Sequence, residues 1–158
     1  MKWDHLNSVL EHYAEALKNE LQQNLLNDGS NASGTLVNSL RYILYVGDTE
    51  MSVSIGLEEY WKFIEYDTKP HWPPIDAIRK WIEVKPVIPQ VRDGRLPTVD
   101  QLAFLISRKI SRDGTQGTQF FHRAQQTVNE RFLLSIEKAV EEDLNEELDI
   151  ILEPLKRL

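Results

Sequence analysis

The feature that most constrains the fold is a long run of apolar side chains at helical spacing in the C-terminal part of the chain. The run begins at Phe121 and recurs at every third or fourth position: Ala124, Val128, Phe132, Leu133, Ile136, Val140, Leu144, Leu148, Ile151 and Leu155. This period predicts one amphipathic helix. A helix of about 35 residues is roughly 50 Å long, more than a small domain spans. We therefore expect residues 129–158 to form an acidic amphipathic assembly arm that packs on another subunit.

The rest of the chain predicts a predominantly helical α+β fold, with a small antiparallel β-hairpin packed against helices. Apolar periodicity predicts helices at about 2–26, 57–67, 74–85 and 99–112, the last capped by Thr98. Two runs rich in β-branched and aromatic residues, around Gly47 and Asp48, predict strands at 35–46 and 51–56. With 158 residues, of which 41% are hydrophobic, the chain suits one compact domain, which we place at residues 1–128.

Charge is unevenly distributed along the chain. Residues 1–70 hold 5 Lys and Arg against 11 Asp and Glu, residues 71–128 hold 9 against 5, and residues 129–158 hold 4 against 9. An acidic chain with a basic middle is a poor general binder of nucleic acid, because such binding depends on neutralising phosphates. The pattern suits a protein that meets differently charged neighbours along its length. The charged N-terminal segment predicts a chain that is neither exported nor inserted in a membrane.

No catalytic or metal-binding constellation can be recognised in the sequence. His5 and His12 share a helix face, but no third ligand accompanies them in sequence. His71 lacks a partner that would make it a general base. The glycines of "RDGTQGTQFF" lack the lysine and the preceding strand of a phosphate loop. We therefore expect no enzymatic activity, no metal and no cofactor.

Aromatic and proline residues gather between Tyr60 and Trp81, where three of the four tryptophans lie. We expect the aromatic and aliphatic side chains here to pack as one cluster, comprising Tyr60, Trp61, Phe63, Ile64, Trp72, Ile78 and Trp81. The connection within this stretch is a rigid, preorganised surface, because each proline restricts itself and its predecessor. Rigid aromatic surface is enriched at protein interfaces. The interface candidates in this connection are Lys69, Pro70, His71, Trp72, Pro73 and Pro74.

Three blocks arrive in an order that resembles the tail-completion or neck proteins of tailed bacteriophages, a family of minor virion proteins. The blocks are "SGTLVNSLRY", "YWKFIEYDTKPHWPPIDAIRKWI" and "AFLISRKISRDGTQGTQFFHRA", so the resemblance covers about residues 33–124. The family's middle block reads Glu-aromatic-Gly-Thr, then a basic residue, Pro-His and Pro-Pro, and a helix ending in Trp-Ile. This chain departs from it at Asp67, which stands before Thr68 where the family has glycine. A positive φ there would have to be adopted by aspartate.

The resemblance implies a structural subunit of the phage head–tail junction, made in the host cytoplasm and incorporated in the virion. Its partners would be copies of itself in a ring of six or twelve, and neighbouring connector or tail terminator proteins, with viral DNA passing through without sequence-specific binding. A ring needs two different patches that meet head to tail. The remaining interface candidates are basic residues of the middle region and apolar residues of the arm: Arg92, Arg95, Arg108, Arg112, Leu144, Leu148, Ile151 and Leu155.

Two other classes of protein compete with this interpretation. A small enzyme requires a convergent polar site, which the sequence does not offer. A non-viral helical adaptor, or another small cytoplasmic interaction protein such as a toxin–antitoxin partner, fits the acidic C-terminal helix but leaves the three blocks unexplained. The host, the ring number and the position of the subunit on the portal or the tail side stay open.

Overall fold

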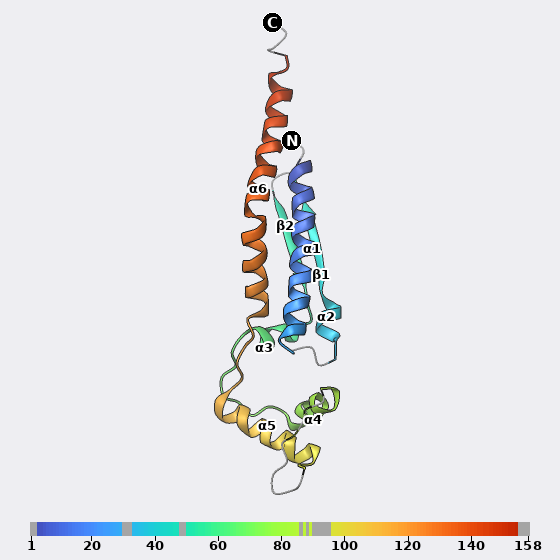
Figure 1. Ribbon diagram of the computed structural model, residues 1–158, viewed down its shortest axis with the longest axis vertical. Coiled ribbons are helices and arrows are strands. Elements are labelled where there is room, and N and C mark those ends of the chain that lie inside the picture. The colour runs from blue at the N-terminus through green and yellow to red at the C-terminus, as the bar shows by residue number, and fades with distance from the viewer. Residues whose placement is uncertain are drawn as a thin grey trace. The chain divides into compact units, whose positions relative to one another are not determined.

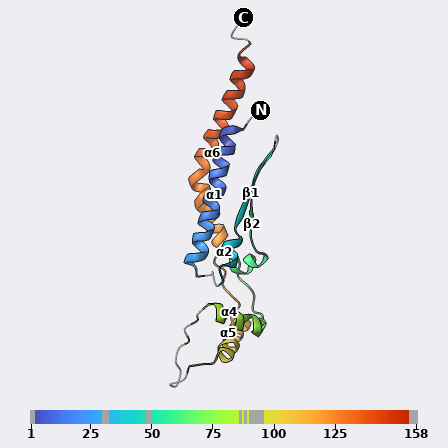
Figure 2. The same cartoon turned by 90° about the vertical axis from the view of Figure 1, so that its right-hand side faces the viewer.

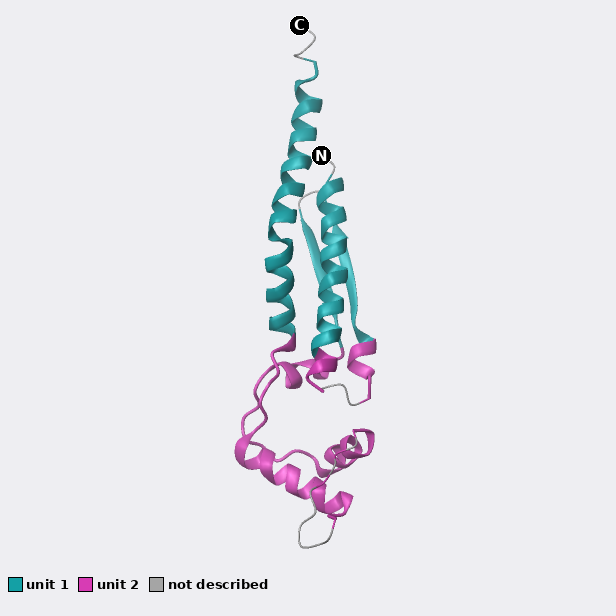
Figure 3. Ribbon diagram, in the orientation of Figure 1, with its two compact units in different colours: residues 1–24, 39–57, 121–158 teal, residues 25–38, 58–120 magenta. Residues whose placement is uncertain are grey.

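The computed structural model describes residues 3–29, 33–47, 50–85, 87, 89 and 96–154. The fold is α+β and predominantly helical, with one two-stranded antiparallel sheet and a long C-terminal helix. The chain divides into two compact units, which Figure 3 distinguishes by colour. Unit 1 comprises residues 1–24, 39–57 and 121–158, and unit 2 comprises residues 25–38 and 58–120. None of the helices among the described residues is long and apolar enough to cross a membrane.

Unit 1 is built on two long antiparallel helices, α1 (Asp4–Asn27) and α6 (Phe120–Leu152), which lie side by side in Figures 1 and 2. Both confirm the predicted helices at 2–26 and in the C-terminal part. Tyr13 joins the two, because its hydroxyl donates to Oδ1 of Asn129 at 2.6 Å and its ring meets Phe132 edge to face at 5.7 Å. The buried apolar side chains of the unit come from both helices and the residue before the hairpin: Ala14, Leu17, Leu21, Leu40, Ala124, Val128 and Ala139.

The two strands of unit 1 form the predicted hairpin. Strand β1 (Arg41–Val46) pairs antiparallel with β2 (Met51–Gly56), in a register that sets Tyr42 opposite Ile55 and Leu44 opposite Val53. Tyr42 and Leu44 are partly covered, whereas Ile43 and Tyr45 on the opposite face are exposed. The alternation follows from the two-residue period of a strand. The hairpin therefore leaves Ile43 and Tyr45 exposed on a face that they share with Ser52 and Ser54 of β2.

The first predicted strand begins too early. Residues 35–39 form a short helix, α2 (Thr35–Ser39), rather than the start of β1. Ser33 supports the first turn, since its Oγ lies 2.8 Å from Oγ1 of Thr35 and accepts a hydrogen bond from the Thr35 amide. Leu36 and Leu40 are both buried and stand four residues apart, a helical spacing. Burial of this pair outweighs the β-propensity of Thr35 and its neighbours.

Unit 2 contains the basic middle of the chain. The expected helix at 57–67 forms only as a 3₁₀ turn, η1 (Glu59–Trp61), and one turn of helix, α3 (Lys62–Glu65), after which Tyr66 is extended. Helices α4 (Ile75–Val84) and α5 (Val99–Asp113) follow and pack on each other. Thr98 caps α5 as predicted, and Gln101 completes a reciprocal capping box with it. Ile82 and Ala103 are buried in this helix pair.

The prediction of one aromatic cluster is wrong. The ring of Trp72 packs on Phe104 at 5.8 Å, and Trp61 meets Tyr66 at 6.2 Å, so the two tryptophans have different partners. Trp81 lies below the ammonium of Lys85, and Phe63 is 70% exposed. The aromatic side chains between Tyr60 and Trp81 therefore make several separate contacts and leave much of their surface exposed to solvent, instead of forming a single buried core.

Candidate functional site

The second and third of the quoted blocks are joined in unit 2 by backbone hydrogen bonds. Thr68 and Thr115 form an antiparallel bridge, in which the amide of each donates to the carbonyl of the other, at 2.9 and 3.2 Å. The amide of Thr118 donates to the Ile64 carbonyl at 2.8 Å. We call these two segments, residues 64–68 and 114–119, the junction. Their bonds fix the beginning of the proline-aromatic connection against the segment that precedes α6.

The junction also shows how the chain uses Asp67. Its Oδ1 accepts a hydrogen bond from the amide of Gly117 at 2.7 Å. The φ angle of Asp67 is not positive, since Gln119 is the single non-glycine residue with positive φ in the described part of the chain. Asp67 therefore does not adopt the positive φ that glycine would allow at this position. The aspartate side chain instead adds a bond across the junction, which glycine does not provide.

Two glycines allow the junction strands to approach closely. A Cβ atom at Gly114, where φ is +73°, would lie 2.1 Å from the carbonyl oxygen of Thr68. One at Gly117 would lie 2.3 Å from the carbonyl oxygen of Glu65. Contacts this short with backbone atoms require the chain to move. Both glycines of the "DGTQGT" segment are therefore needed for packing within unit 2.

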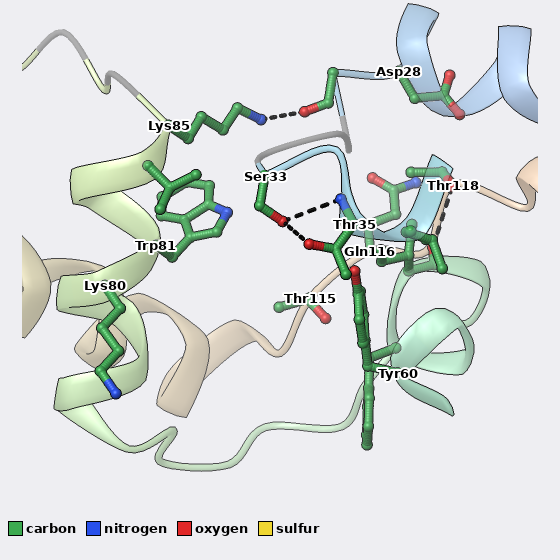
Figure 4. Close-up of a pocket in the computed structure, with 15 residues that line it drawn as sticks. Asp28, Ser33, Thr35, Tyr60, Lys80, Trp81, Lys85, Thr115, Gln116 and Thr118 are labelled. Atoms are coloured by element: carbon green, nitrogen blue, oxygen red, sulfur yellow. Dashed lines mark hydrogen bonds between the residues drawn. The ribbon is translucent and has the colours of Figure 1, made fainter. Parts of the chain in front are cut away.

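A pocket of about 630 Å³ lies beside the junction, and residues of all three quoted blocks line it. Figure 4 shows Trp81 on α4 opposite Ser33 and Thr35, with Thr115 and Tyr60 below these two residues in the view. The ammonium of Lys85 donates to the Gly29 carbonyl at its edge. The lining surface is mostly apolar and includes the buried Leu36. The three blocks that carry the resemblance thus converge on one place in the fold.

The predicted interface residues of the proline-aromatic connection lie between the junction and α4. Lys69, Pro70, His71 and Pro74 are exposed, whereas Pro73 is buried. The ring of His71 bonds its Nδ1 to the Lys69 carbonyl at 2.9 Å, which holds the imidazole against its own backbone. Half of the Trp72 surface is exposed beside Phe104 of α5. This surface therefore continues onto α5.

A second cavity, of about 1380 Å³, runs along the exposed side of α5 and is here called the α5 groove. Its lining combines apolar residues near the start of the helix with basic residues near its end, including Leu96, Phe104, Leu105, Arg108, Lys109 and Arg112. Arg112 forms a two-bonded ion pair with Asp113, at 2.7 and 2.8 Å. The groove therefore places two of the predicted basic candidates, Arg108 and Arg112, together. Arg92 and Arg95 lie outside the described residues.

The predicted apolar residues of the arm lie on α6 in unit 1. Leu144, Leu148 and Ile151 occupy one face at helical spacing and are about half exposed. Val128, Ala139 and Asp143 are buried on the side that faces α1. Most of α6 thus packs within unit 1, and its last turns continue past the start of α1 in Figures 1 and 2. Leu155 lies outside the described residues.

Asp143 makes a buried polar contact from α6 to α1. Its side chain is almost fully buried, and Oδ1 and Oδ2 accept hydrogen bonds from the amides of His5 and Leu6 at 3.0 and 2.9 Å. Oδ1 also lies 2.9 Å from Nδ1 of His5. These amides belong to the first turn of α1 and lack partners within the helix. A carboxylate from α6 therefore caps α1, where the helix dipole favours negative charge.

The ionisation of Asp143 and His5 reflects this contact. Burial raises the pKa of Asp143, but the amides of Leu6 and His5 and the His5 ring lower it more, so it lies below its usual value. Hydrogen bonding to Asp143 raises the pKa of His5, and the charges of Glu146 and Glu142 raise it further, against a lowering by burial. Both pKa shifts favour the charged form of the group, which is an imidazolium for His5 and a carboxylate for Asp143.

His5, Asp143 and Glu146 each offer one possible metal-ligand atom within 4.8 Å of the others. The sequence did not reveal this group of three, because its members are far apart along the chain. Both carboxylate oxygens of Asp143 already accept amide hydrogen bonds, and Nδ1 of His5 is engaged with Oδ1. Zn²⁺ would have to displace these bonds to gain the three or four ligands that it requires. The geometry is that of a helix cap rather than a metal centre.

The chain matches none of the family models, curated proteins or solved structures with which it was compared.

Proposed function

We propose that this chain is a non-enzymatic structural subunit of the head–tail junction of a tailed bacteriophage, made in the bacterial cytoplasm and assembled into the virion. The observation that carries the proposal is that the three resemblance blocks converge in unit 2. All three line the pocket, and the second and third are hydrogen-bonded to each other through residues 64–68 and 114–119. A resemblance that concerns one folded unit requires its blocks to lie together in that unit. Their convergence supports the view that the resemblance concerns one folded unit.

The exposed apolar surface supports a role in assembly. Ile43 and Tyr45 on the hairpin are each exposed by more than half, and so are Leu148 and Ile151 on α6. Apolar patches of this kind on a soluble protein commonly mark protein–protein contacts. Among the described residues the sheet has two strands, so an edge strand could pair with a strand of another chain. Contacts with copies of itself and with neighbouring connector or tail proteins would cover these surfaces.

In necks isolated from the virion, we expect electron microscopy to show this chain as a ring around the DNA channel, with six or twelve copies. Repeated head-to-tail contacts between identical subunits close into such a ring. Antibody fragments against an exposed segment, such as residues 69–72, would mark the subunit positions. A single copy lying off the axis would contradict the proposal. Absence of the chain from purified virions would favour the alternative, a non-viral adaptor.

A further inference from the structure

We propose that the last turns of α6 of one copy bind in the α5 groove of a second copy. The segment concerned, residues 141–152, is here called the α6 end. The proposal rests on the proposed function in one respect: a ring requires two different surfaces of each subunit to meet. It adds which two surfaces these are, and it identifies the occupant of the groove as a helix of the same chain.

Charge complementarity points to this pairing. The α6 end carries no Lys or Arg and six acidic residues, of which Asp143 is buried against α1. The other five are Glu141, Glu142, Glu146, Glu147 and Asp149. The lining of the α5 groove carries Arg108, Lys109 and Arg112, of which Arg112 is ion-paired with Asp113, and none of its described lining residues is acidic. Opposite charges at two surfaces favour their encounter and fix their register. Two copies of either surface would repel each other, so the contact joins unlike surfaces.

The apolar residues of the two surfaces also match. Leu144, Leu148 and Ile151 form a stripe on the α6 end, and helical geometry places Glu147 beside it. In the groove, Leu105 and Arg108 stand three positions apart, so a basic side chain similarly adjoins an apolar one. An amphipathic helix recognises a groove in this manner, with apolar anchors at its centre and charges at its rim.

The size of the groove favours a polypeptide over a small ligand. Pockets that enclose small molecules commonly measure about 300–1,000 Å³. The α5 groove, at about 1380 Å³, exceeds that range. It follows one face of a helix of 15 residues, a length comparable with that of the α6 end. A second helix laid along α5 would fill such a groove.

Disulfide trapping tests the contact in the full-length chain, which has no cysteine of its own. A Leu105→Cys chain is mixed with a differently tagged Leu148→Cys chain and oxidised. The proposal predicts a disulfide-linked heterodimer in at least fivefold excess over that formed when Leu134→Cys replaces Leu148→Cys. Leu134 is a matched control, because it is an exposed leucine of the same helix outside the α6 end. Equal yields with Leu134→Cys and Leu148→Cys, or no heterodimer with either, would overturn the proposal.

Two further variants separate a specific contact from a chance collision. Arg108→Glu in the Leu105→Cys chain should lower the yield several-fold, and Glu147→Arg in the Leu148→Cys chain should restore it. Lys80→Glu on α4, outside the groove, should leave the yield unchanged. A Leu105→Cys, Leu148→Cys double variant that closes only within its own chain would overturn the contact between copies.

The outcome is distinguishable from the fate of the proposed function. Trapping without any role of the chain in phage particles would leave the contact standing and end the phage assignment. If the chain is needed to join heads to tails but no disulfide-linked heterodimer forms, the proposed function would stand and the contact between the α6 end and the α5 groove would be refuted.

Discussion

Replacing Gly114 by alanine is expected to lower the free energy of unfolding of unit 2 by about 3 kcal/mol, which combines the cost of an overpacked contact with that of a left-handed backbone. The added Cβ would meet the Thr68 carbonyl oxygen at 2.1 Å, and φ is +73°. Gly117→Ala, whose Cβ would meet the Glu65 carbonyl oxygen at 2.3 Å, should destabilise the junction similarly. Urea denaturation gives the change in stability, and hydrogen exchange at the Thr68 and Thr115 amides reports on the junction itself.

Gly29→Ala separates the two causes. Gly29 also has a positive φ, +63°, but the nearest atom to an added Cβ is the Lys85 ammonium nitrogen at 3.7 Å. This variant therefore introduces backbone strain without a clash, and we expect a loss of only about 1 kcal/mol. If Gly114→Ala and Gly29→Ala lose the same stability, the close approach of the two junction segments does not exist in solution.

Replacing Asp143 by alanine is expected to lower the stability of unit 1 by about 2–4 kcal/mol, since two partly buried amides in the first turn of α1 would lose their acceptor. The amides are those of His5 and Leu6. Asp143→Asn, which keeps one carbonyl oxygen, should lose less. Glu141→Ala, an exposed acidic residue two positions away, should change stability by less than about 0.5 kcal/mol. Equal effects of Asp143→Ala and Glu141→Ala would contradict the capping role.

The effect of Asp143→Ala should depend on pH in a defined direction. Asp143 has a lowered pKa, so its contribution is present above the ordinary value of 3.8 and is lost as pH falls through the folded value. His5 has a raised pKa, so its contribution is complete below 6.5 and is lost as pH rises through the folded value. The difference between wild type and Asp143→Ala should therefore be larger at about pH 5.5 than at about pH 8.5. A difference that grows above pH 6.5 would exclude an imidazolium–carboxylate contact.

The elements that could be predicted from sequence are those whose residues repeat locally. The apolar period of α1 and α6 predicted both helices, and Thr98 marked the start of α5, because these signals lie within one or a few turns. Thr35–Ser39 was mistaken for a strand because its β-branched residues outweighed the four-residue spacing of two buried leucines.

The contacts between distant segments could not be predicted. His5 and Asp143 are 138 positions apart, and Gly117 and Asp67 are 50 apart, so neither bond leaves a local pattern. The prediction of one aromatic cluster was wrong for another reason, because amino-acid composition does not show which aromatic rings are buried. The α5 groove was anticipated only in its charge: Arg108 and Arg112 were named, but the apolar residues beside them were not.

Inactivating the gene for this chain in the phage that encodes it tests the proposed function most directly. The proposal predicts cells that accumulate DNA-filled heads and separate tails, with few joined particles in electron micrographs. The wild-type chain supplied from a plasmid should restore infectious particles, whereas a chain carrying Gly114→Ala should restore fewer. Joined and infectious particles from cells that lack the chain would contradict the proposed function.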